Sequence, residues 1–436
     1  MQNLIVQAGN EAFAKWRGRV RVPGDKSVSH RSIMLGALAE GTTHVSGFLQ
    51  GEDSLNTLRA FRAMGVQITD PVDGCLTIRG VGLHGLSAPA SDVYLGNSGT
   101  SMRLLAGILA GQKFSSVLTG DSSLAKRPMR RVIEPLQVMG AHIDSVDGKP
   151  PLRIKGNALL SGIDYVMPMA SAQVKSCVLL AGLYAQNITA VTEPAPTRDH
   201  TERMLHAFGY AITRSANRVS LQGQGRLIAT TIEVPGDISS AAFFMVAAAI
   251  TPGADILIER VGLNPTRTGV IDILRLMGAD ITVLDETLLS GEPVGTLRVR
   301  GSELVGIDIP THLVPLAIDE FPAIFIAAAC AQGVTRLTDA EELRVKESDR
   351  IQVMADGLRV LGINAEPTAD GIVIEGGAFG GGEINSHGDH RIAMSFAMAA
   401  LRAQGSIHIL DCENINTSFP GFVPLVQGCG LQVSVA

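Results

Sequence analysis

One pattern recurs six times along the chain, and it restricts the fold more than any other feature of the sequence. Each copy has an apolar helix rich in small residues, a β-rich run, and in most copies an amphipathic second helix that stops at glycine. The stopping glycines are spaced 75, 69, 69, 84 and 68 residues apart, at Gly65, Gly140, Gly209, Gly278, Gly362 and Gly430. Glycine there predicts a left-handed helix C-cap, followed by a short strand.

The repeat length decides between two architectures. The apolar first helices are expected at residues 30–41, 101–112, 174–186, 241–253, 322–333 and 390–405. A solenoid would show shorter periods and atypical capping repeats. A chain of 436 residues is also too long for one ordinary core. We therefore expect an α/β protein with two similar domains of three units each.

Composition excludes several classes of function. The net charge is −6 and aromatic residues make up 4% of the chain, which does not suit a protein that binds nucleic acid. The five cysteines form no CxxC pair and are expected to be reduced cytosolic thiols. Residues 1–20 lack the apolar core of a secretory signal, and the longest apolar runs are too short to span a bilayer. A cytoplasmic protein without membrane contact is expected.

The loops that enter the first helices differ among the six copies, and this is where chemistry is expected. Ser27, Ser98, Ser171 and Ser239 precede apolar helices and can be ordinary N-caps. Basic residues are harder to explain, because a helix N-terminus repels cations unless an anion joins them. Such residues lie in or near the first turns at Lys26, Arg31, Arg103, Lys175 and Arg391. Each can be an exposed surface charge, but their shared position favours an anionic ligand.

Acidic residues accompany these cations. Asp319 and Glu320 stand in AIDEFP, and Glu347 stands beside Lys346 in RVKESDR. Lys346 and Glu347 form either a surface pair or, with Asp319 nearby, a proton-transfer group. The pair His387 and His390 has metal-ligand spacing without a third ligand, so no metal is expected. PGDKS lacks the full phosphate-loop frame, which argues against a nucleotide triphosphatase.

Nine stretches together resemble the 5-enolpyruvylshikimate-3-phosphate synthase family over nearly the whole chain. They are PGDKSVSHR, LGNSGTSMRLL, GDSSLAKRPM, ASAQVK, RDHTE, IDEFP, RVKESDR, GDHRIAM and NTSFPGF. The resemblance implies the enolpyruvyl transferase fold, an inverse α/β barrel of two domains with three βαβαββ units each and the active site in the cleft between them. It implies that VPGD, at residues 22–25 and again at 234–237, marks where the chain crosses between domains. The first domain would then comprise residues 1–24 and 237–436, and the second residues 25–236.

The resemblance also implies a reaction without a cofactor, in which the enolpyruvyl group of phosphoenolpyruvate passes to the 5-hydroxyl of shikimate 3-phosphate and phosphate is released. The residues implied to bind shikimate 3-phosphate are Lys26, Ser27, Arg31, Ser171, Ala172, Gln173, Arg198, Asp319 and Lys346. Those implied to bind phosphoenolpyruvate are Lys26, Asn97, Gly99, Arg127, Gln173, Arg350 and Arg391. Asp319 is the expected base, Glu347 the expected proton donor to the methylene carbon, with Lys26 and Lys346 assisting. A monomer is expected.

One position departs from the family pattern. Many members have SKTFP near the C-terminus, whose lysine contacts phosphoenolpyruvate, whereas NTSFP here puts Thr417 in that place. The motifs GDKSV, SAQVK, RDHTE and NPTR resemble the glyphosate-tolerant class II branch, where that lysine is commonly absent. Gly99 leaves room that an alanine fills in some tolerant members.

Two other functions remain open at this stage. The sister transferase that acts on UDP-N-acetylglucosamine shares the fold but uses a mobile-loop cysteine, and the corresponding loop GDSSLAKRPM has none. A non-catalytic sugar-phosphate binder would not need Asp319, Lys346 and Glu347 together.

Overall fold

The computed structural model describes residues 2–8 and 16–436, and it divides into two compact units. Unit 1 comprises Met1–Pro23, Pro235–Thr287 and Pro293–Ala436, and unit 2 comprises Gly24–Val234 and Leu288–Glu292. The prediction that the N-terminus holds no secretory signal falls partly on residues 1 and 9–15, which lie outside the described residues. Each unit has its own hydrophobic core.

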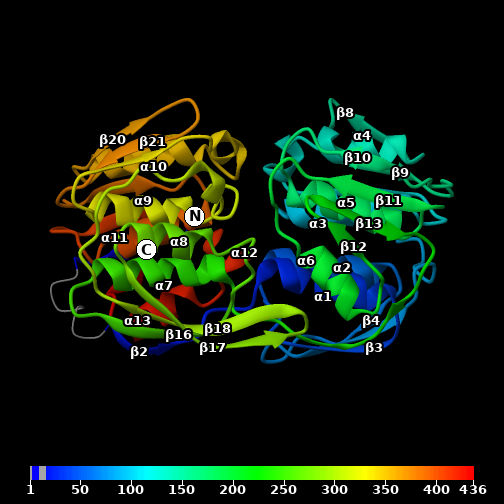
Figure 1. The fold of residues 1–436 in the computed structure, drawn as a ribbon, viewed down its shortest axis with the longest axis horizontal. Coiled ribbons are helices and arrows are strands. Elements are labelled where there is room, and N and C mark those ends of the chain that lie inside the picture. Colours follow the sequence, from blue (N-terminus) through cyan, green and yellow to red (C-terminus); the bar gives the residue numbers. More distant parts are fainter. Residues whose placement is uncertain (1, 9–15) are drawn as a thin grey trace. The chain divides into compact units, whose positions relative to one another are not determined.

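Unit 2 contains the first three repeats (Figure 1). Its helices are α1 (Lys26–Leu38), α2 (Glu52–Ala63), α3 (Gly99–Ala110), the 3₁₀ turn η2 (Leu124–Lys126), α4 (Arg130–Val138), α5 (Ala172–Gly182) and α6 (His200–Ala207). Its strands are β3 (Ala39–Ser46), β4 (Gln67–Ile68), β5 (Leu76–Val81), β6 (Val93–Tyr94), β7 (Ser116–Thr119), β8 (His142–Val146), β9 (Lys149–Lys155), β10 (Asp164–Val166), β11 (Ile188–Thr192), β12 (Thr213–Ser215), β13 (Arg218–Gln222), β14 (Leu227–Ile228) and β15 (Thr231–Glu233).

Unit 1 contains the other three repeats. Its helices are α7 (Ile238–Ile250), α8 (Gly269–Leu276), η3 (Thr311–Leu313), α9 (Phe321–Cys330), η4 (Glu341–Val345), α10 (Arg350–Val360), α11 (His390–Ala399), α12 (Ile415–Ser418) and α13 (Phe422–Gly428). Its strands are β1 (Leu4–Val6), β2 (Arg17–Val20), β16 (Asp255–Gly262), β17 (Asp280–Leu289), β18 (Glu292–Arg300), β19 (Val334–Leu337), β20 (Asn364–Pro367), β21 (Ile372–Glu375), β22 (Gly382–Asn385), β23 (Ile407–Leu410) and β24 (Val433–Val435).

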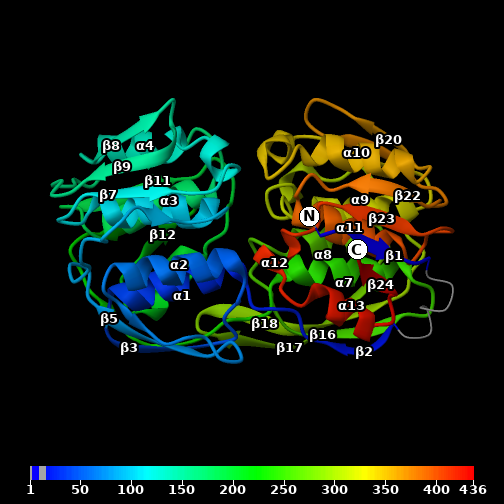
Figure 2. The same ribbon diagram turned by 180° about the vertical axis from the view of Figure 1, so that it is seen from behind.

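The strands of the described residues form six small sheets, one for each predicted repeat. Their orders are β14-β3-β5-β4 with β15 beside β3, β6-β7-β9-β8, β10-β11-β13-β12, β17-β18-β16-β2, β19-β21-β20 and β22-β23-β1-β24. In unit 2 each sheet has a parallel pair that two antiparallel strands continue. Figure 2 shows how the N-terminal strand β1 lies between β23 and β24, so both ends of the chain complete the last sheet of unit 1.

The prediction that six glycines end the second helices is confirmed. All six have a positive φ, from +78° at Gly209 to +102° at Gly140. Each follows the C-cap of its helix by one residue, as in α2, where Met64 is the C-cap and Gly65 comes next. A side chain in this left-handed region would be strained, which is why the sequence keeps glycine there.

The first helices of the repeats form the interior of each unit. Every residue of α7 is buried, and α1 is buried from Val28 to Leu38. Alanine, glycine and serine occur often in these helices because small side chains let neighbouring helices and sheets approach closely. A buried helix shows no apolar stripe, which explains why these segments are apolar on all sides.

The two VPGD segments lie against each other. The backbone N–H of Asp237 donates to the carbonyl of Pro23 at 2.9 Å. A Cβ on Gly24 would stand 1.9 Å from the carbonyl oxygen of Gly47 and 3.1 Å from a methyl of Val234. Glycine at position 24 is therefore required by the close approach of backbone. Two of the divisions between the units fall inside these segments, after Pro23 and after Val234, and the other two enclose Leu288–Glu292.

Three features of the described residues bear on the possible classes of function. None of their helices has the length and apolar character needed to cross a membrane. No group of three or more His, Cys, Asp or Glu side chains within residues 2–8 and 16–436 is arranged to hold a metal ion. All five cysteines are free thiols, and burial raises the pKa of Cys177 to about 12.

Candidate active site

The first predicted site residue, Lys26, begins helix α1. Asp25 caps this helix by accepting from the N–H of Val28 at 2.8 Å. The Lys26 ammonium lies 2.6 Å from Asp53 Oδ2, at the start of α2, and 22% of the lysine side chain is exposed. The helix dipole favours a carboxylate near the N-terminus of α2, where Asp53 is in position to hold the Lys26 ammonium. The Lys26 side chain stays partly exposed to solvent.

Arg31, one turn further along α1, is buried, with 4% of its surface exposed. Its Nε donates to Thr201 Oγ1 at 2.7 Å, Nη1 to the carbonyl of Ser27 at 3.0 Å, and Nη2 to Ser176 Oγ at 2.9 Å. Burial lowers the pKa of Arg31 to about 10, partly opposed by the carboxylate of Glu202, so the guanidinium stays charged at neutral pH. Arg31 thus ties α1 to α5 and α6.

The turn that enters α3 brings together three of the residues predicted to bind phosphoenolpyruvate in unit 2, namely Asn97, Gly99 and Arg127. Arg127 donates through Nη2 to the amide oxygen of Asn97. A Cβ on Gly99 would stand 3.2 Å from Nη1 of Arg127 and 3.1 Å from Nη1 of Arg103. The absence of a side chain at Gly99 therefore makes room for two guanidinium groups at one helix N-terminus.

Gln173 connects this turn to α5. Its amide oxygen accepts from Arg103 at 2.5 Å, and its amide nitrogen donates to Thr100 Oγ1 at 3.0 Å. Gln173 therefore joins the start of α5 to the first turn of α3.

The remaining residues predicted to hold the 3-phosphate lie at two helix starts. Ser171 caps α5 and accepts from the N–H of Val174 at 3.4 Å, so Ala172 is the first residue of that helix. Arg198 lies two residues before α6 and is partly exposed. Backbone N–H groups at a helix N-terminus beside a guanidinium suit a phosphate group.

The N-cap prediction for the four serines is half right. Ser98 and Ser171 cap α3 and α5 as expected. For Ser27 and Ser239 it is wrong, because Asp25 and Asp237, two residues earlier in each VPGD segment, cap α1 and α7.

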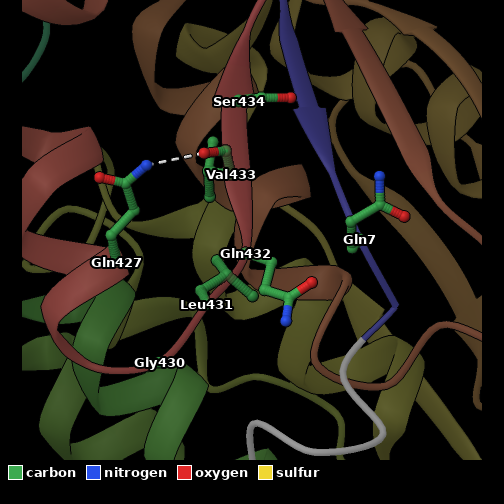
Figure 3. Close-up of a pocket in the computed structure, with 7 residues that line it drawn as sticks. All are labelled: Gln7, Gln427, Gly430, Leu431, Gln432, Val433 and Ser434. Atoms are coloured by element: carbon green, nitrogen blue, oxygen red, sulfur yellow. Dashed lines mark hydrogen bonds between the residues drawn. The ribbon is translucent and has the colours of Figure 1, made fainter.

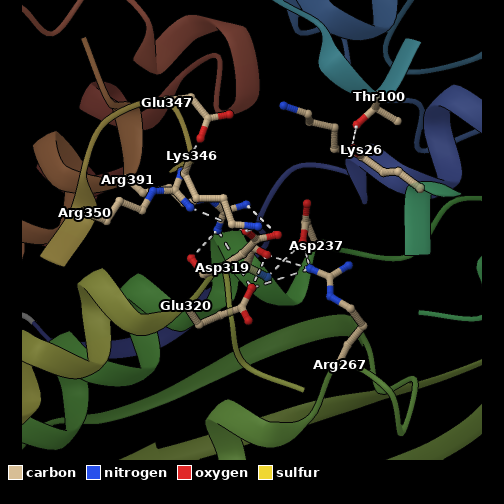
Figure 4. Close-up of polar contacts among 12 residues, drawn as sticks. Lys26, Thr100, Asp237, Arg267, Asp319, Glu320, Lys346, Glu347, Arg350 and Arg391 are labelled. Carbon is tan, nitrogen blue, oxygen red and sulfur yellow. Dashed lines mark hydrogen bonds and ion pairs between the residues drawn. The ribbon is translucent and has the colours of Figure 1, made fainter. Parts of the chain in front are cut away.

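In unit 1, Asp319 lies just before α9 among three cations (Figure 4). Its Oδ1 is 3.4 Å from Nη1 of Arg350 and 3.6 Å from Nζ of Lys346. Its Oδ2 is 4.0 Å from Nη2 of Arg391, and Nη1 of Arg391 donates to the Asp319 carbonyl at 2.9 Å. The cations hold the carboxylate in one place while 15% of its side chain stays exposed.

Arg350 is held from the opposite side by Asp389, the N-cap of α11. Nε of Arg350 donates to Asp389 Oδ2 at 2.8 Å, and both side chains are buried. Burial by itself lowers the pKa of Arg350, but the carboxylates of Asp389, Glu347 and Asp319 raise it above the ordinary value. For Asp389, burial by itself raises the pKa of the carboxyl, but the Arg350 guanidinium holds that pKa below its usual range. Both groups are therefore charged.

Lys346 and Glu347 were open to two interpretations, and neither side chain pairs with the other. Lys346 lies 2.9 Å from Glu342 and also reaches Asp319, whereas Glu347 lies 2.7 Å from Nη2 of Arg350. Both belong to the Asp319 group rather than to an isolated surface pair. Thr417 donates to the carbonyl of Asn414 at 2.6 Å, so its hydroxyl serves the turn of α12.

Sequence reasoning missed one residue of the site and misread another. Asp53 was missed, although an acidic residue in the first turn of α2, after a glycine, is a signal of a helix start that can also bind a nearby cation. Lys175 was grouped with cations that meet an anionic ligand. That prediction is wrong, because its side chain is fully buried and its ammonium contacts Glu193 and Glu202.

A separate hollow of about 480 Å³ lies near β24 and contains none of the predicted site residues (Figure 3). It is lined by Gln7, Gln427, Gly430, Leu431, Gln432, Val433 and Ser434. None of these side chains is charged, so the hollow offers no cation to a phosphate or carboxylate ligand.

The charged group around Asp319 can perform acid–base chemistry on a bound anion. Arginines bind carboxylate and phosphate groups by paired hydrogen bonds, and Arg391 is partly exposed, with 14% of its side chain accessible. Asp319 and Glu347 are two carboxylates attached to the same guanidinium of Arg350, so they are held at fixed positions in the same group.

The chain is similar to known proteins over nearly its whole length. Residues 11–425 match the family model described as EPSP synthase (3-phosphoshikimate 1-carboxyvinyltransferase). The chain is 66% identical over 423 residues to 3-phosphoshikimate 1-carboxyvinyltransferase of Methylococcus capsulatus, with 97% of each chain covered. It is 61% identical over 438 residues to the protein of that name from Acidithiobacillus ferrooxidans, with 100% of each covered.

Solved structures give the same answer for the fold. The EPSP synthase of Acinetobacter baumannii superimposes with a TM-score of 0.91, at 61% identity and over 100% of both chains. This likeness confirms the predicted enolpyruvyl transferase fold. The family match, the identity over the full length and the shared fold show that the chain belongs to the EPSP synthase (3-phosphoshikimate 1-carboxyvinyltransferase) family.

Proposed function

We propose that this chain transfers the enolpyruvyl group of phosphoenolpyruvate to the 5-hydroxyl of shikimate 3-phosphate and releases phosphate, a step of the shikimate pathway to aromatic amino acids. The observation that carries the proposal is the fixed position of Asp319 among Lys346, Arg350 and Arg391, with Glu347 on the same guanidinium. A reaction between two anionic substrates needs cations to bind them and carboxylates to move protons. Membership of the family supports the same reaction.

The roles proposed for the carboxylates follow from the bonds that must change. Asp319 takes the proton of the 5-hydroxyl as its oxygen bonds to C2 of phosphoenolpyruvate. Glu347 gives a proton to the methylene carbon, and that carbon must lose a proton again when the bond from C2 to the phosphate oxygen breaks. Lys26 and Lys346 assist by stabilising negative charge on the reacting groups.

The binding roles use the groups described above. Shikimate 3-phosphate is assigned to the helix starts at Ser171–Gln173 and Arg198, with Lys26, Ser27, Arg31, Asp319 and Lys346. The residues assigned to phosphoenolpyruvate are Lys26, Asn97, Gly99, Arg127, Gln173, Arg350 and Arg391. Since the guanidinium of Arg31 already donates to three protein oxygens, any contact with substrate must use its remaining N–H groups.

Phosphate release from the two substrates tests the proposal. Purified protein should release phosphate from phosphoenolpyruvate when shikimate 3-phosphate is the acceptor. It should release none when UDP-N-acetylglucosamine is the acceptor instead. Asp319→Asn should lower kcat by ~10²-fold or more while the calorimetric Kd for shikimate 3-phosphate changes little. Asp308→Asn is the matched control, because that carboxylate is 81% exposed and pairs only at the surface with Arg336. If neither acceptor supports phosphate release, the transferase proposal is wrong and the chain is a non-catalytic sugar-phosphate binder.

A cytoplasmic location and a monomeric state also belong to the proposal. Five free thiols suit a reducing compartment. Light scattering of the purified protein should give the chain mass of 45.8 kDa, and a mass of twice that value would contradict the monomer.

A further inference from the structure

Lys175 is the least exposed cation near the predicted substrate ligands of unit 2. It lies in the first turn of α5, and none of its side chain is exposed. Its ammonium is 2.7 Å from Glu202 Oε1, 2.9 Å from Glu193 Oε1 and 3.4 Å from the carbonyl of Thr197. A buried ammonium needs such partners, because an uncompensated charge in the interior is costly.

One of these carboxylates, Glu193, closes the turn that leads to Arg198. Glu193 Oε2 accepts from the N–H of Thr197 at 3.0 Å and also from the Thr197 hydroxyl. The Glu193 carbonyl accepts from the side chain of Asn217 at 2.8 Å. Thr197 directly precedes Arg198, so residues 193–197 are held to Lys175 at both ends of the turn.

The second carboxylate brings α6 and α1 into the same group. Glu202 belongs to the first turn of α6, next to Thr201, whose hydroxyl accepts from Arg31 and donates to Ser176. Ser176 follows Lys175 on α5. The cations Lys175 and Arg31 are therefore balanced by the carboxylates Glu193 and Glu202, and all four side chains are buried.

Three segments assigned to the sugar phosphate meet at this buried group. Lys175 is four residues after Ser171 on α5, and its backbone N–H donates to the Ser171 carbonyl at 3.0 Å. The turn before Arg198 and the Ser27–Arg31 turn of α1 are the other two. Lys175 itself has no exposed surface through which it could touch a ligand.

We propose that Lys175 is a positioning residue that fixes the Arg198 turn against the start of α5, and so sets the affinity for the phosphate of shikimate 3-phosphate. The inference rests on the proposed function, since it takes both segments as the phosphate ligands. Charge-assisted hydrogen bonds to a phosphate depend on distance and angle, so a residue that touches no substrate can control affinity by placing the groups that do. Phosphoenolpyruvate shares only Gln173 and Lys26 with the ligands of shikimate 3-phosphate and is otherwise assigned to other segments, so its binding should be affected less.

The test is a charge-balanced double variant, Lys175→Met/Glu193→Gln. It removes one cation and one carboxylate, leaves Arg31 with Glu202, and keeps an acceptor for Thr197. We expect the calorimetric Kd and the KM for shikimate 3-phosphate to rise by ~10-fold or more, while kcat and the KM for phosphoenolpyruvate stay within about 3-fold of wild type. The single variant Glu193→Gln should also raise the Kd for shikimate 3-phosphate, by a smaller factor.

Leu180→Ala is the matched control for lost stability. Leu180 lies on the same helix, is 1% exposed, and belongs to the hydrophobic core. It should lower the melting temperature without a change in the Kd for shikimate 3-phosphate. If it raises that Kd as much as the double variant does, the effect is general and the positioning role is wrong.

The remaining outcomes separate the two proposals. Wild-type protein that does not bind shikimate 3-phosphate would contradict the proposed function. Wild-type protein that binds it, with folded Lys175→Met/Glu193→Gln or Glu193→Gln protein binding it equally well, would overturn the positioning role alone.

Discussion

The two VPGD turns have the same backbone role and opposite arrangements of charge. Helices α1 and α7 each have 13 residues, each is capped by the aspartate of VPGD, and each is followed by an eight-residue strand. At α1 the cation is Lys26 on the helix itself, and the anion is Asp53 at the start of the next helix. At α7 the anion is the capping Asp237, and the cation is Arg267, just before the next helix α8.

Exposure separates the two turns further. Lys26 is 22% exposed and can meet a ligand, whereas Arg267 is 3% exposed. Arg267 lies 3.3 Å from Asp237, donates to Ser239 at 2.6 Å, and stands 3.6 Å from the buried Glu320 (Figure 4). Glu320 is also 3.8 Å from Nη1 of Arg391. The comparison indicates that the repeat preserves the turn and its cap, while one copy leaves its cation partly exposed, where we propose that it meets a ligand, and the other buries its cation among carboxylates.

Arg267→Met should give the largest effect, by removing internal support at the second turn. It leaves Asp237 and Glu320 as buried carboxylates that have lost a cation, and breaking a buried pair costs about 3–5 kcal/mol. Urea denaturation measures the loss. Arg19→Met, which removes an exposed partner of Glu259, should cost less than about 1 kcal/mol. Equal losses for the two variants would show that Arg267 is no more structural than a surface arginine.

Lys26→Met should give the opposite result at the first turn. We expect phosphate release to fall by ~10²-fold or more, because a cation that stabilises charge in the reaction is removed. Stability should change much less than in Arg267→Met, since Asp53 remains near the N-terminus of α2. Ile238→Met, at the matching position of α7, should leave turnover within about 2-fold. Near-normal phosphate release by Lys26→Met protein would contradict the proposed role of Lys26 in the reaction.

His30 gives the smallest effect, and it depends on pH. It is fully buried on α1 and contacts Thr57 Oγ1 at 2.8 Å, while the matching residue of α7 is Ala242. Burial, and then the charges of Lys26 and Arg31, lower the pKa of His30 well below its ordinary value. As the pH falls below about 6.5, the unfolded chain therefore takes up a proton that the folded chain does not, and stability decreases.

For this one group the loss is about 1 kcal/mol between pH 6.5 and 5.5. His30→Gln should show a pH-dependent loss smaller by that amount when urea unfolding is compared at the two values. The exposed His408→Gln is the control and should behave like wild type. If His30→Gln and wild-type protein lose the same free energy of unfolding between the two pH values, protonation of His30 does not destabilise the folded protein. The two turns would then not differ in their response to pH.

Some parts of the site followed from sequence because they depend on residues close together in the chain. The six glycine C-caps are confirmed, since a left-handed residue after a helix is required by local backbone geometry. The family motifs identified the reaction class and the fold. Within AIDEFP and RVKESDR, the sequence indicated which acids and bases to consider, and the structure brings Asp319, Lys346 and Arg350 together. The domain boundaries, the oligomeric state and the roles of single residues stay predictions.

The sequence by itself determined the repeat, the caps that glycine forms, and the kinds of side chain available for binding anions. Only the tertiary structure decided which cations face solvent. Lys26 and Lys175 both lie in the first turn of an apolar helix, yet Lys26 is partly exposed beside Asp53 and Lys175 is buried between Glu193 and Glu202. Those carboxylates lie 18 and 27 residues from Lys175 along the chain. Burial and ion pairing depend on contacts between distant segments, which packing of the whole unit creates and no local pattern encodes.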